Sequence, residues 1–382
     1  MQGNESLKAV VLAGGLGTRL RPLTYSRPKP MLPLGPKPVL QYVIELLSGS
    51  GFDEIIVTTN YLQEQIEDYF GDGSRFGVSL RFPREEKPLG TAGSVKNAQQ
   101  YLDETFALIQ GDNITDIDMA KQLKYHLKKN AIATLSVVKV GEPWKYGVVM
   151  LDRGSRIVGF QEKPASRECR SNLINTGLYI LEPDVLDVIP PSQSFDFAKD
   201  VFPILLEQRR ILYAYRAKGF WTDIGSVEGF FEGSRWLLSK VTRHFSPSVD
   251  ASFARITGRV HIGDGTTLGK GVTIRGPAYI EDNCAVMENT VLNSDTILKR
   301  NVSVGENSRI NGALIFESTK IRSKVTLNQC IIDQKCEIGS NSVIEELAII
   351  GAGCTIGDDA IIGRGVKINP GVIVERGKTI RT

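Results

Sequence analysis

The chain has 382 residues, of which 41% are hydrophobic, and its formal net charge is only +3. This length favours two domains, and the near balance of charge argues against a nucleic-acid-binding protein, which usually carries a basic excess. No apolar run approaches the length of a membrane helix, and the polar start has no signal-peptide core. Five scattered cysteines without a CxxC pair favour a reducing cytoplasm over a disulfide framework or a zinc site.

The first 240 residues alternate strand-like and helix-like segments. We predict strands at Lys8–Ala13, Glu54–Thr58, Val78–Phe82 and Phe106–Gln110, and helices at Pro38–Leu47, Gln63–Phe70, Ala92–Tyr101 and Met119–Lys129. This alternation predicts an α/β domain with a parallel sheet covered by helices. Ligands of such sheets bind beyond the carboxyl ends of the strands, so the loops after Ala13, Phe82 and Gln110 are expected to line one site.

The pattern changes after residue 240. Apolar residues then recur at every sixth position, from Ile256 to Ile310 and, after a slip near Phe316, from Ile332 to Ile380. Glycine or another small residue often follows them. This period predicts a β-solenoid built from hexapeptide repeats, and the regular hexads resemble a left-handed β-helix. We therefore predict a first domain over residues 1–240, a linker over 241–255 and a β-helix domain over 256–382.

The segment that begins at Lys8 reads KAVVLAGGLGTRLRPLTYSRPKPMLPLGPKPVL. The three glycines within Ala13–Arg19 allow backbone N–H groups to approach phosphate oxygens closely, and two cations, Arg19 and Lys29, can add full charges. Neither a Walker A loop nor a dinucleotide fingerprint is present, because no GK[ST] follows and the third glycine of GxGxxG is missing. A phosphate-binding loop or an ordinary glycine-rich turn both fit this spacing.

The same segment resembles the signature of the sugar-1-phosphate nucleotidylyltransferases. Further motifs of that family follow in order, namely LGTAG from Leu89, GDN from Gly111, KYGVV from Lys145, EKP from Glu162, INTGLYI from Ile174 and FWTDIG from Phe220. The resemblance spans the whole first domain and implies a Rossmann-like nucleotidyltransferase fold. It also implies that the partners are a nucleoside triphosphate and a sugar-1-phosphate.

By this resemblance Asp112 and Asp223 hold a magnesium ion, which suits a site with few carboxylates and with phosphate ligands. Arg19 contacts the triphosphate, and Lys29 contacts phosphate near the reacting centre. These four residues are the predicted catalytic group. The reaction joins two anions, so positioning and charge stabilisation are expected to dominate.

The resemblance also assigns residues to the two substrates. The sugar-1-phosphate is expected to meet Gly147, Glu162, Lys163 and Asn175. The nucleotide is expected to meet Leu12, Ala13, Gly14, Gly15, Gly17, Thr18, Glu85, Pro88 and Gly90.

The choice of base depends mainly on Glu85. A carboxylate only accepts hydrogen bonds, and guanine offers two adjacent donors, whereas uracil and thymine offer one donor beside acceptors. Glu85 therefore favours GTP. The local sequences around Glu85, Tyr146 and Ile174 also resemble mannose-1-phosphate guanylyltransferases, whereas Gly111-Asp112-Asn113 is the form familiar from glucose-1-phosphate thymidylyltransferases.

Other functions remain open at this point. A uridylyltransferase or thymidylyltransferase of glucose-1-phosphate, a bifunctional N-acetylglucosamine-1-phosphate uridylyltransferase/acetyltransferase and a non-catalytic sensor of sugar nucleotides share the family's motifs. An acetyltransferase needs a general base, and the chain has only His126, His244 and His261, of which His261 is expected to face outward. We expect the solenoid to serve assembly, as part of a homo-oligomer.

Overall fold

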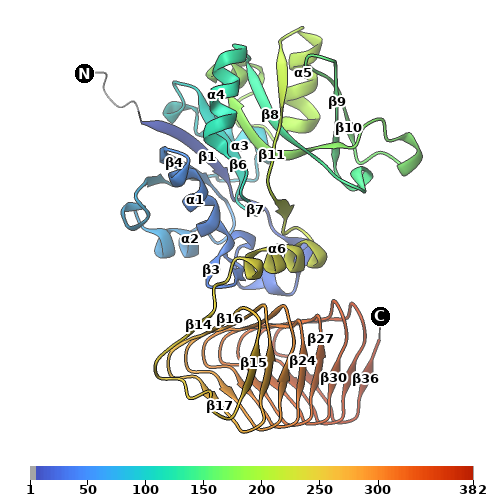
Figure 1. Cartoon of the computed structure of the whole chain (residues 1–382). Coiled ribbons are helices and arrows are strands. Elements are labelled where there is room, and N and C mark those ends of the chain that lie inside the picture. Colours follow the sequence, from blue (N-terminus) through green and yellow to red (C-terminus); the bar gives the residue numbers. More distant parts are fainter. Residues whose placement is uncertain (1–5, 382) are drawn as a thin grey trace. The chain divides into compact units, whose positions relative to one another are not determined.

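The computed structural model describes residues 6–381, which fold into two compact units (Figure 1). The first unit contains the described residues up to Leu16 together with Pro28–Met31 and Val39–Asp223. The second contains Gly17–Arg27, Leu32–Pro38 and the chain from Ile224 onward. The predicted boundary at residue 240 therefore differs from the division by contacts, in which α6 (Val227–Ser239) and two segments near the N-terminus belong with the solenoid.

A sheet of nine strands forms the centre of the first unit, with the order β10-β9-β11-β6-β1-β4-β5, while β8 pairs with β11 and β12. Their bounds are β1 Leu7–Leu12, β4 Phe52–Thr58, β5 Ser79–Arg81, β6 Phe106–Gln110, β8 Ala133–Lys139, β9 Gly147–Leu151, β10 Ile157–Glu162, β11 Leu173–Leu181 and β12 Leu212–Arg216. The four predicted strands correspond to β1, β4, β5 and β6, which are parallel to their neighbours in this group.

The prediction of a parallel sheet holds for that half and for the parallel pair of β8 and β12, but not for the remaining strands. Strand β11 runs antiparallel to β6, β8 and β9, and β9 pairs with β10 as an antiparallel hairpin. No helix separates β9 from β10, and a hairpin needs only a short turn, whereas a parallel pair needs a long crossover. The sheet is therefore mixed, as in a Rossmann-like nucleotidyltransferase core.

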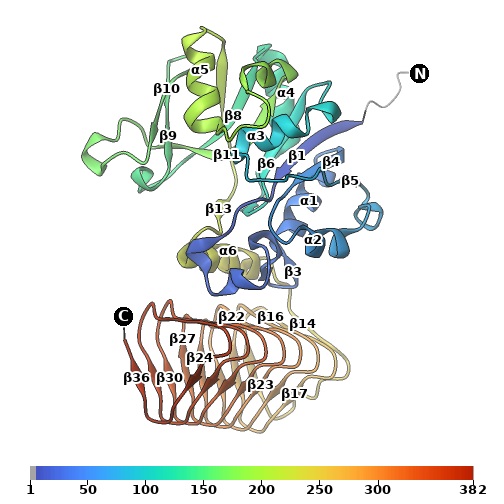
Figure 2. The same cartoon turned by 180° about the vertical axis from the view of Figure 1, so that it is seen from behind.

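Helices cover both faces of this sheet, as the two opposite views show (Figure 2). Their bounds are α1 Val39–Gly49, α2 Gln63–Phe70, α3 Gly90–Asn97, α4 Met119–Lys129 and α5 Phe202–Glu207. The side chain of Asp118 accepts a hydrogen bond from Lys121 N and caps α4, and Asn130 ends it in the left-handed conformation. The bounds predicted for α2 and α4 are confirmed, whereas α3 begins earlier than predicted and ends at Asn97.

The central strand β1 is buried on both faces. Ala9 and Val11 pack in the cluster that contains α1 and α2 side chains, and Val10 packs in the cluster that contains α3 and α5 side chains. All three residues are fully buried. The end of β1 is thereby fixed in the middle of the sheet, where a ligand site is expected.

The second unit contains a parallel β-helix, as in left-handed hexapeptide solenoids. Two of its sheets run from β15 (Arg255–Thr257) to β36 (Thr379–Ile380) and from β17 (Thr267–Leu268) to β35 (Ile373–Val374). The third contains β14 His244–Phe245, β16 Val260–Ile262, β19 Ala278–Ile280, β22 Thr296–Leu298, β25 Leu314–Ile315, β28 Ile331–Ile332, β31 Ile349–Ile350 and β34 Lys367–Ile368. Aliphatic residues at the predicted hexad positions fill the interior.

The start of the β-helix differs from the prediction. The predicted linker contains β14, which pairs with β16, so the β-helix begins inside residues 241–255. The slip near Phe316 is confirmed: neighbouring coils are generally offset by 18 residues, but by 17 around this point. His244 therefore lies in a strand, and its ring stacks on His261, which stacks in turn on Tyr279 at a centroid distance of 4.5 Å.

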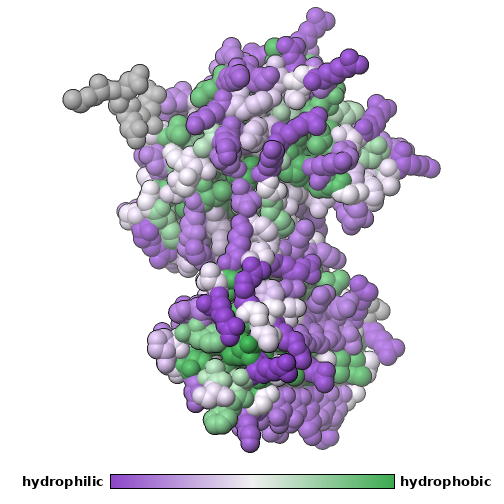
Figure 3. Space-filling view, in the orientation of Figure 1, coloured by the Kyte–Doolittle hydropathy of each residue, from purple (hydrophilic) through white to green (hydrophobic). Residues whose placement is uncertain are grey.

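The viewed surface carries mainly hydrophilic side chains with small hydrophobic areas between them (Figure 3). Within residues 6–381, no helix is long and apolar enough to cross a membrane. All five cysteines lie in the described part of the chain and are free thiols.

Candidate active site

The end of β1 lies between the ends of two parallel neighbours. Ala13 N donates a hydrogen bond to Thr58 O over 2.8 Å, and Gly111 N donates to Leu12 O over 2.9 Å. The first residues of the glycine-rich segment therefore leave the sheet beside the loops that follow β4 and β6. These loops meet because the carboxyl ends of parallel strands share one edge of the sheet.

Gly14 and Gly15 then expose their backbone. A Cβ on Gly14 would lie 3.5 Å from Asn60 Oδ1, and a Cβ on Gly15 would meet nothing within 4 Å. Packing within the protein does not require glycine at position 15. The open main chain is instead the arrangement that a closely approaching phosphate requires.

Gly17, Thr18 and Arg19 belong to the second unit. Gly17 has a φ of 60° and precedes a short 3₁₀ helix from Thr18 to Leu20. The side chain of Thr24 donates to Gly17 O over 2.9 Å, and Lys367 Nζ donates to Arg19 O over 2.7 Å. The Arg19 residue is exposed, so its backbone is held while its guanidinium group faces solvent or a ligand.

Lys29 and Asp112 are brought together in the first unit. Lys29 is only 8% exposed and lies between two buried prolines, Pro28 and Pro30. Its ammonium group donates to Asp112 Oδ2. Asp112 Oδ1 is also buried, but it has no hydrogen-bond partner within residues 6–381. The carboxylate therefore retains one oxygen for a further cationic or donor group.

The second predicted metal carboxylate lies on a neighbouring strand. Asp223 ends β13 (Trp221–Asp223), which pairs antiparallel with β7 (Asn113–Thr115) so that Asp223 is opposite Asn113. Asn113 directly follows Asp112. Asp112, in the turn before β7, is therefore next to the residue that pairs with Asp223, although the described residues contain no group of three or more His, Cys, Asp or Glu arranged for a metal.

This donor set fits magnesium better than a metal that needs a full protein cage. Two carboxylates with an unsatisfied oxygen on Asp112 suit a hard cation that takes its remaining ligands from water and phosphate. The site would therefore depend on a phosphate-bearing substrate to complete the coordination.

The carbonyl of Thr176 links the carboxylate strands to β11. It accepts hydrogen bonds from Asn113 Nδ2 over 3.1 Å and from Trp221 Nε1 over 2.9 Å. The Trp221 ring also packs edge-to-face against Tyr146, with 5.7 Å between ring centroids. Sequence reasoning missed Thr176 and Trp221 as residues that organise the site, although both lie inside quoted motifs.

The predicted sugar-side residues meet at the hairpin of β9 and β10. Gly147 pairs with Glu162, and a Cβ on Gly147 would lie 3.2 Å from Glu162 Oε2 and 3.9 Å from Asn175 Cβ. Asn175 is held by Tyr179, whose hydroxyl accepts a hydrogen bond from Asn175 Nδ2 over 2.8 Å. The structure therefore brings Gly147, Glu162 and Asn175 together.

Lys163 follows Glu162 with an unusual backbone conformation. Its φ is 42°, and its N–H donates to Tyr146 O over 3.2 Å. A lysine in the left-handed region is strained, and such residues concentrate at functional sites. The side chain is 60% exposed and its Nζ lies 3.9 Å from Glu162 Oε1, so it is accessible to an anion.

Two residues predicted to meet the nucleotide, Glu85 and Pro88, lie between β5 and α3, and Gly90 is the first residue of α3. Both carboxylate oxygens of Glu85 are buried, and neither has a hydrogen-bond partner in the described chain. Burial raises the pKa of Glu85, because the charged form loses its hydration, and the nearby Ser94 hydroxyl, which donates to Gly90 O, offsets part of this rise. Pro88 is exposed. Two donors placed against Glu85 would stabilise its ionised form.

Gly90 has a structural reason to be glycine. Its φ is 71°, and a Cβ there would lie 2.6 Å from Phe195 O. The same carbonyl accepts a hydrogen bond from Ala92 N over 2.9 Å, and Phe195 N donates to Leu89 O. The predicted contact of Gly90 with a nucleotide stays a prediction, because packing alone already explains the residue.

The three histidines do not form a catalytic group with one another. His126 lies in α4 and is buried, and its ring nitrogens contact Thr134 Oγ1 at 2.9 Å and Glu182 Oε1 at 2.8 Å. His261 is half-buried on the outer side of the solenoid between His244 and Tyr279.

Comparison with known proteins supports the geometry. The Nucleotidyl transferase model matches residues 8–240, and the GMPPB C-terminal domain model matches residues 274–362. The UTP–glucose-1-phosphate uridylyltransferase of Synechocystis sp. is 38% identical over 309 residues, which cover 73% of this chain and 80% of the relative. The mannose-1-phosphate guanylyltransferase of Mycobacterium tuberculosis is 33% identical over 332 residues, which cover 86% and 84%.

A solved structure, that of HddC from Yersinia pseudotuberculosis complexed with GMP-PN, is 29% identical and has a TM-score of 0.53; the match covers 60% of this chain and 99% of that one. The first family model spans the first-unit sheet and every residue of the candidate site. The chain thus belongs to the nucleotidyl transferase family and is an enzyme of the sugar-1-phosphate nucleotidyltransferase type.

Proposed function

We propose that the protein transfers a guanylyl group from GTP to mannose-1-phosphate, forming GDP-mannose and releasing pyrophosphate. The observation that carries the choice of base is Glu85, whose two buried carboxylate oxygens lack hydrogen-bond donors in the described chain. Guanine has two adjacent donors, N1–H and the N2 amino group, which match these two acceptors. The relatives named mannose-1-phosphate guanylyltransferases support the choice of sugar.

The transfer needs no protein nucleophile. An oxygen of the sugar-1-phosphate attacks the α-phosphorus of the triphosphate, a new P–O bond forms, and the bond to the β-phosphate oxygen breaks as pyrophosphate leaves. Lys29 is proposed to balance the charge at the reacting phosphate, and Arg19 to hold the triphosphate. Fixed cations of this kind act by positioning and by stabilising charge in the transition state.

Asp112 and Asp223 are proposed to hold Mg²⁺, which when bound would neutralise charge on phosphate oxygens. The unsatisfied Oδ1 of Asp112 and the pairing of β13 with β7 support this assignment. Lys29 donates a hydrogen bond to the other oxygen of Asp112. On the sugar side, Lys163 is proposed to bind the phosphate, and Glu162 and Asn175 the hydroxyl groups.

A second candidate is the transfer of a uridylyl group to glucose-1-phosphate. It is favoured by the relative from Synechocystis, which is 38% identical and is named UTP–glucose-1-phosphate uridylyltransferase. The two reactions share every proposed phosphate and metal contact. They differ in the donors and acceptors that the base presents to Glu85.

Pyrophosphate release decides between these candidates. The full chain is assayed with Mg²⁺, each of GTP, UTP, dTTP, ATP and CTP, and a panel of hexose-1-phosphates. The proposal expects the largest kcat/KM for GTP with mannose-1-phosphate. A preference for UTP with glucose-1-phosphate would reject it, and binding of nucleotide without turnover of any pair would support a sensor.

We also propose a cytoplasmic homo-oligomer that assembles through the solenoid. Large apolar side chains on the second unit support an association surface, since Phe253 is 67% exposed and Ile373 is 74% exposed. Light scattering after size exclusion tests the assembly: a monomeric mass at micromolar concentration would reject it.

A further inference from the structure

One corner of the solenoid departs from the glycine pattern. From β16 to β34, each strand of the sheet that begins with β14 has an aliphatic residue that points into the solenoid, and the next residue lies at a corner of the coil. This corner residue is glycine at Gly263 and Gly351, where a Cβ would come within 3 Å of backbone atoms of the next coil. In the four coils between them this position, here called the corner column, holds Glu281, Lys299, Phe316 and Asp333. These four residues are 8%, 5%, 1% and 1% exposed.

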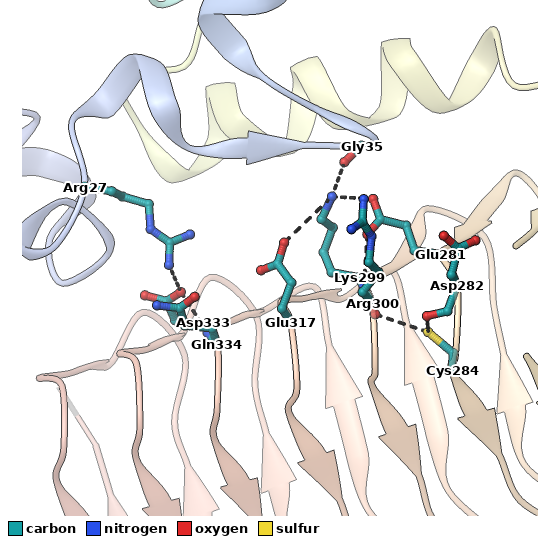
Figure 4. Close-up of polar contacts among 10 residues, drawn as sticks. All are labelled: Arg27, Gly35, Glu281, Asp282, Cys284, Lys299, Arg300, Glu317, Asp333 and Gln334. Carbon is teal, nitrogen blue, oxygen red and sulfur yellow. Dashed lines mark hydrogen bonds and ion pairs between the residues drawn. The ribbon is translucent and has the colours of Figure 1, made fainter. Parts of the chain in front are cut away.

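The corner column contacts two other stretches of the second unit, Gly17–Arg27 and Leu32–Pro38. Asp333 Oδ1 accepts a hydrogen bond from Arg27 Nη2 over 2.9 Å, and the guanidinium carbon of Arg27 lies 5.6 Å from the centre of the Phe316 ring. Lys299 Nζ donates to Gly35 O over 3.0 Å (Figure 4). Coils of the solenoid thus hold both of these stretches.

A second set of charges secures Lys299 itself. Its ammonium group donates to Glu281 Oε1 and lies 3.9 Å from Glu317 Oε1, and Glu281 Oε2 accepts from Arg300 N over 3.0 Å (Figure 4). The corner column therefore presents one fixed donor and one fixed acceptor to the two stretches.

Stability alone does not explain this arrangement. Buried ion pairs cost desolvation, and apolar residues of similar volume are often as stabilising or more so. Asp333 Oδ2 is buried with no hydrogen-bond partner in the part of the chain that the structure describes, which adds to the cost. Lys367 of the same sheet also donates to Arg19 O, so a third solenoid residue holds the first of the two stretches.

We infer that Asp333 and Lys299 are positioning residues for nucleotidyl transfer, which hold the second-unit segment that carries Arg19 in its productive conformation through Arg27 and Gly35. Arg27 lies eight residues after Arg19, so a shift of Arg27 is transmitted along a short stretch of chain. The inference rests on the proposed role of Arg19 in binding the triphosphate.

The test compares Asp333→Asn, Arg27→Ala, the double variant and Arg27→Lys in the full chain. Asp333→Asn keeps the size of the buried group and removes its charge, so the chain is expected to fold. We expect kcat/KM for the triphosphate to fall roughly 10- to 100-fold in either single variant, since small misplacements of phosphate-binding groups have effects of this size. The kcat/KM of the double variant should be no lower than that of the less active single variant. Arg27→Lys should retain more of the wild-type kcat/KM than Arg27→Ala.

Two further measurements separate positioning from a general loss of structure. The KM for the sugar-1-phosphate should stay within about twofold of the wild type, because that side of the site lies in the first unit. Hydrogen–deuterium exchange should become faster in peptides covering residues 17–27 and stay unchanged in β1 and β6. The matched control is the exposed solenoid pair Arg376–Asp359, joined over 2.9 Å, and Asp359→Asn should change neither activity nor exchange.

Unchanged kcat/KM in folded Asp333→Asn and Arg27→Ala would overturn the inference, even if exchange of residues 17–27 increased. The inference would also be overturned if these variants changed the KM for both substrates equally and hydrogen–deuterium exchange rose throughout the chain. Arg19→Ala distinguishes this failure from that of the proposed function. If Arg19→Ala loses activity and Asp333→Asn does not, only the positioning inference is rejected. If Arg19→Ala is fully active, the proposed role of Arg19 in binding the triphosphate is itself rejected.

Discussion

Lys29 and Asp112 form an ion pair in which only one of the two carboxylate oxygens is engaged. Both side chains are largely shielded from solvent, at 10% and 18% exposure, so the attraction between them is poorly screened. The proposed metal and Lys29 therefore share one carboxylate. A bound triphosphate would offer Lys29 phosphate oxygens as an alternative partner to Asp112.

Asp112→Asn should lower kcat by roughly 10²- to 10³-fold, because the amide keeps the shape of the side chain but lacks the charge that holds the metal. Steady-state pyrophosphate release at several Mg²⁺ concentrations measures the effect. The required Mg²⁺ concentration should also rise. Asp68→Asn is a suitable control, since Asp68 is exposed on α2 away from the sheet edge. A variant with normal kcat at normal Mg²⁺ would contradict the assignment of Asp112.

Glu85→Gln should shift the choice of base from GTP towards UTP. The amide can donate to a carbonyl of uracil, whereas it loses one of the two acceptors that guanine requires. We expect the ratio of kcat/KM for GTP to that for UTP to fall by roughly 10- to 100-fold, the range for a lost pair of charge-assisted hydrogen bonds. Competition assays with both triphosphates in one mixture measure this ratio directly.

Glu86→Gln provides the control for this experiment, because Glu86 is exposed next to Glu85. It should leave the ratio unchanged. An unchanged ratio in Glu85→Gln as well would show that Glu85 does not face the base.

Local patterns predicted much of the fold and of the site. The periodicity located α2, α4 and β6 to the residue, and the six-residue spacing identified the solenoid and its slip near Phe316. The phosphate segment was recognisable because its glycines and cations are neighbours in the chain. These features depend on residues within one element, so the sequence displays them directly.

Features that join distant segments were not predictable in the same way. Strand β11 is antiparallel to β6, and the Thr176 carbonyl receives donors from two other strands, yet main-chain pairing leaves no mark on side-chain periodicity. The contact between Arg27 and Asp333 joins residues 306 positions apart. One signal for it was present, since the corner column loses its glycines at these coils.

Gly15→Ala and Gly90→Ala should separate ligand contact from packing. Alanine at position 15 meets nothing within 4 Å, so the free energy of unfolding should stay within about 0.5 kcal/mol of the wild type. The KM for the triphosphate should rise, because the methyl group occupies space proposed for phosphate. Denaturant unfolding and initial-rate kinetics on the same preparation measure both effects.

Gly90→Ala should show the opposite behaviour. The positive φ and the 2.6 Å approach to Phe195 O predict a destabilisation of about 1–3 kcal/mol. The two variants serve as controls for each other, since both add one methyl group to the proposed nucleotide side. Equal loss of stability in both, with no change in KM for Gly15→Ala, would argue that Gly15 is an ordinary turn residue.

His126 should make the first unit sensitive to acid. Burial lowers the pKa of His126 below 6.5, and the contact with Glu182 offsets only part of this shift. The unfolded chain therefore binds the proton more tightly than the folded chain, so the free energy of unfolding decreases as the pH falls below about 6.5 towards the folded-state pKa. Unfolding by urea at pH values between 5 and 7.5 measures this slope.

Replacing the imidazole removes this contribution to the slope. His126→Gln keeps a donor for Glu182 but cannot titrate, so its free energy of unfolding should be lower than that of the wild type at pH 7.5 and closer to it at pH 5. A His126→Gln variant with the same pH slope as the wild type would show that the pKa of His126 is the same in the folded and the unfolded chain.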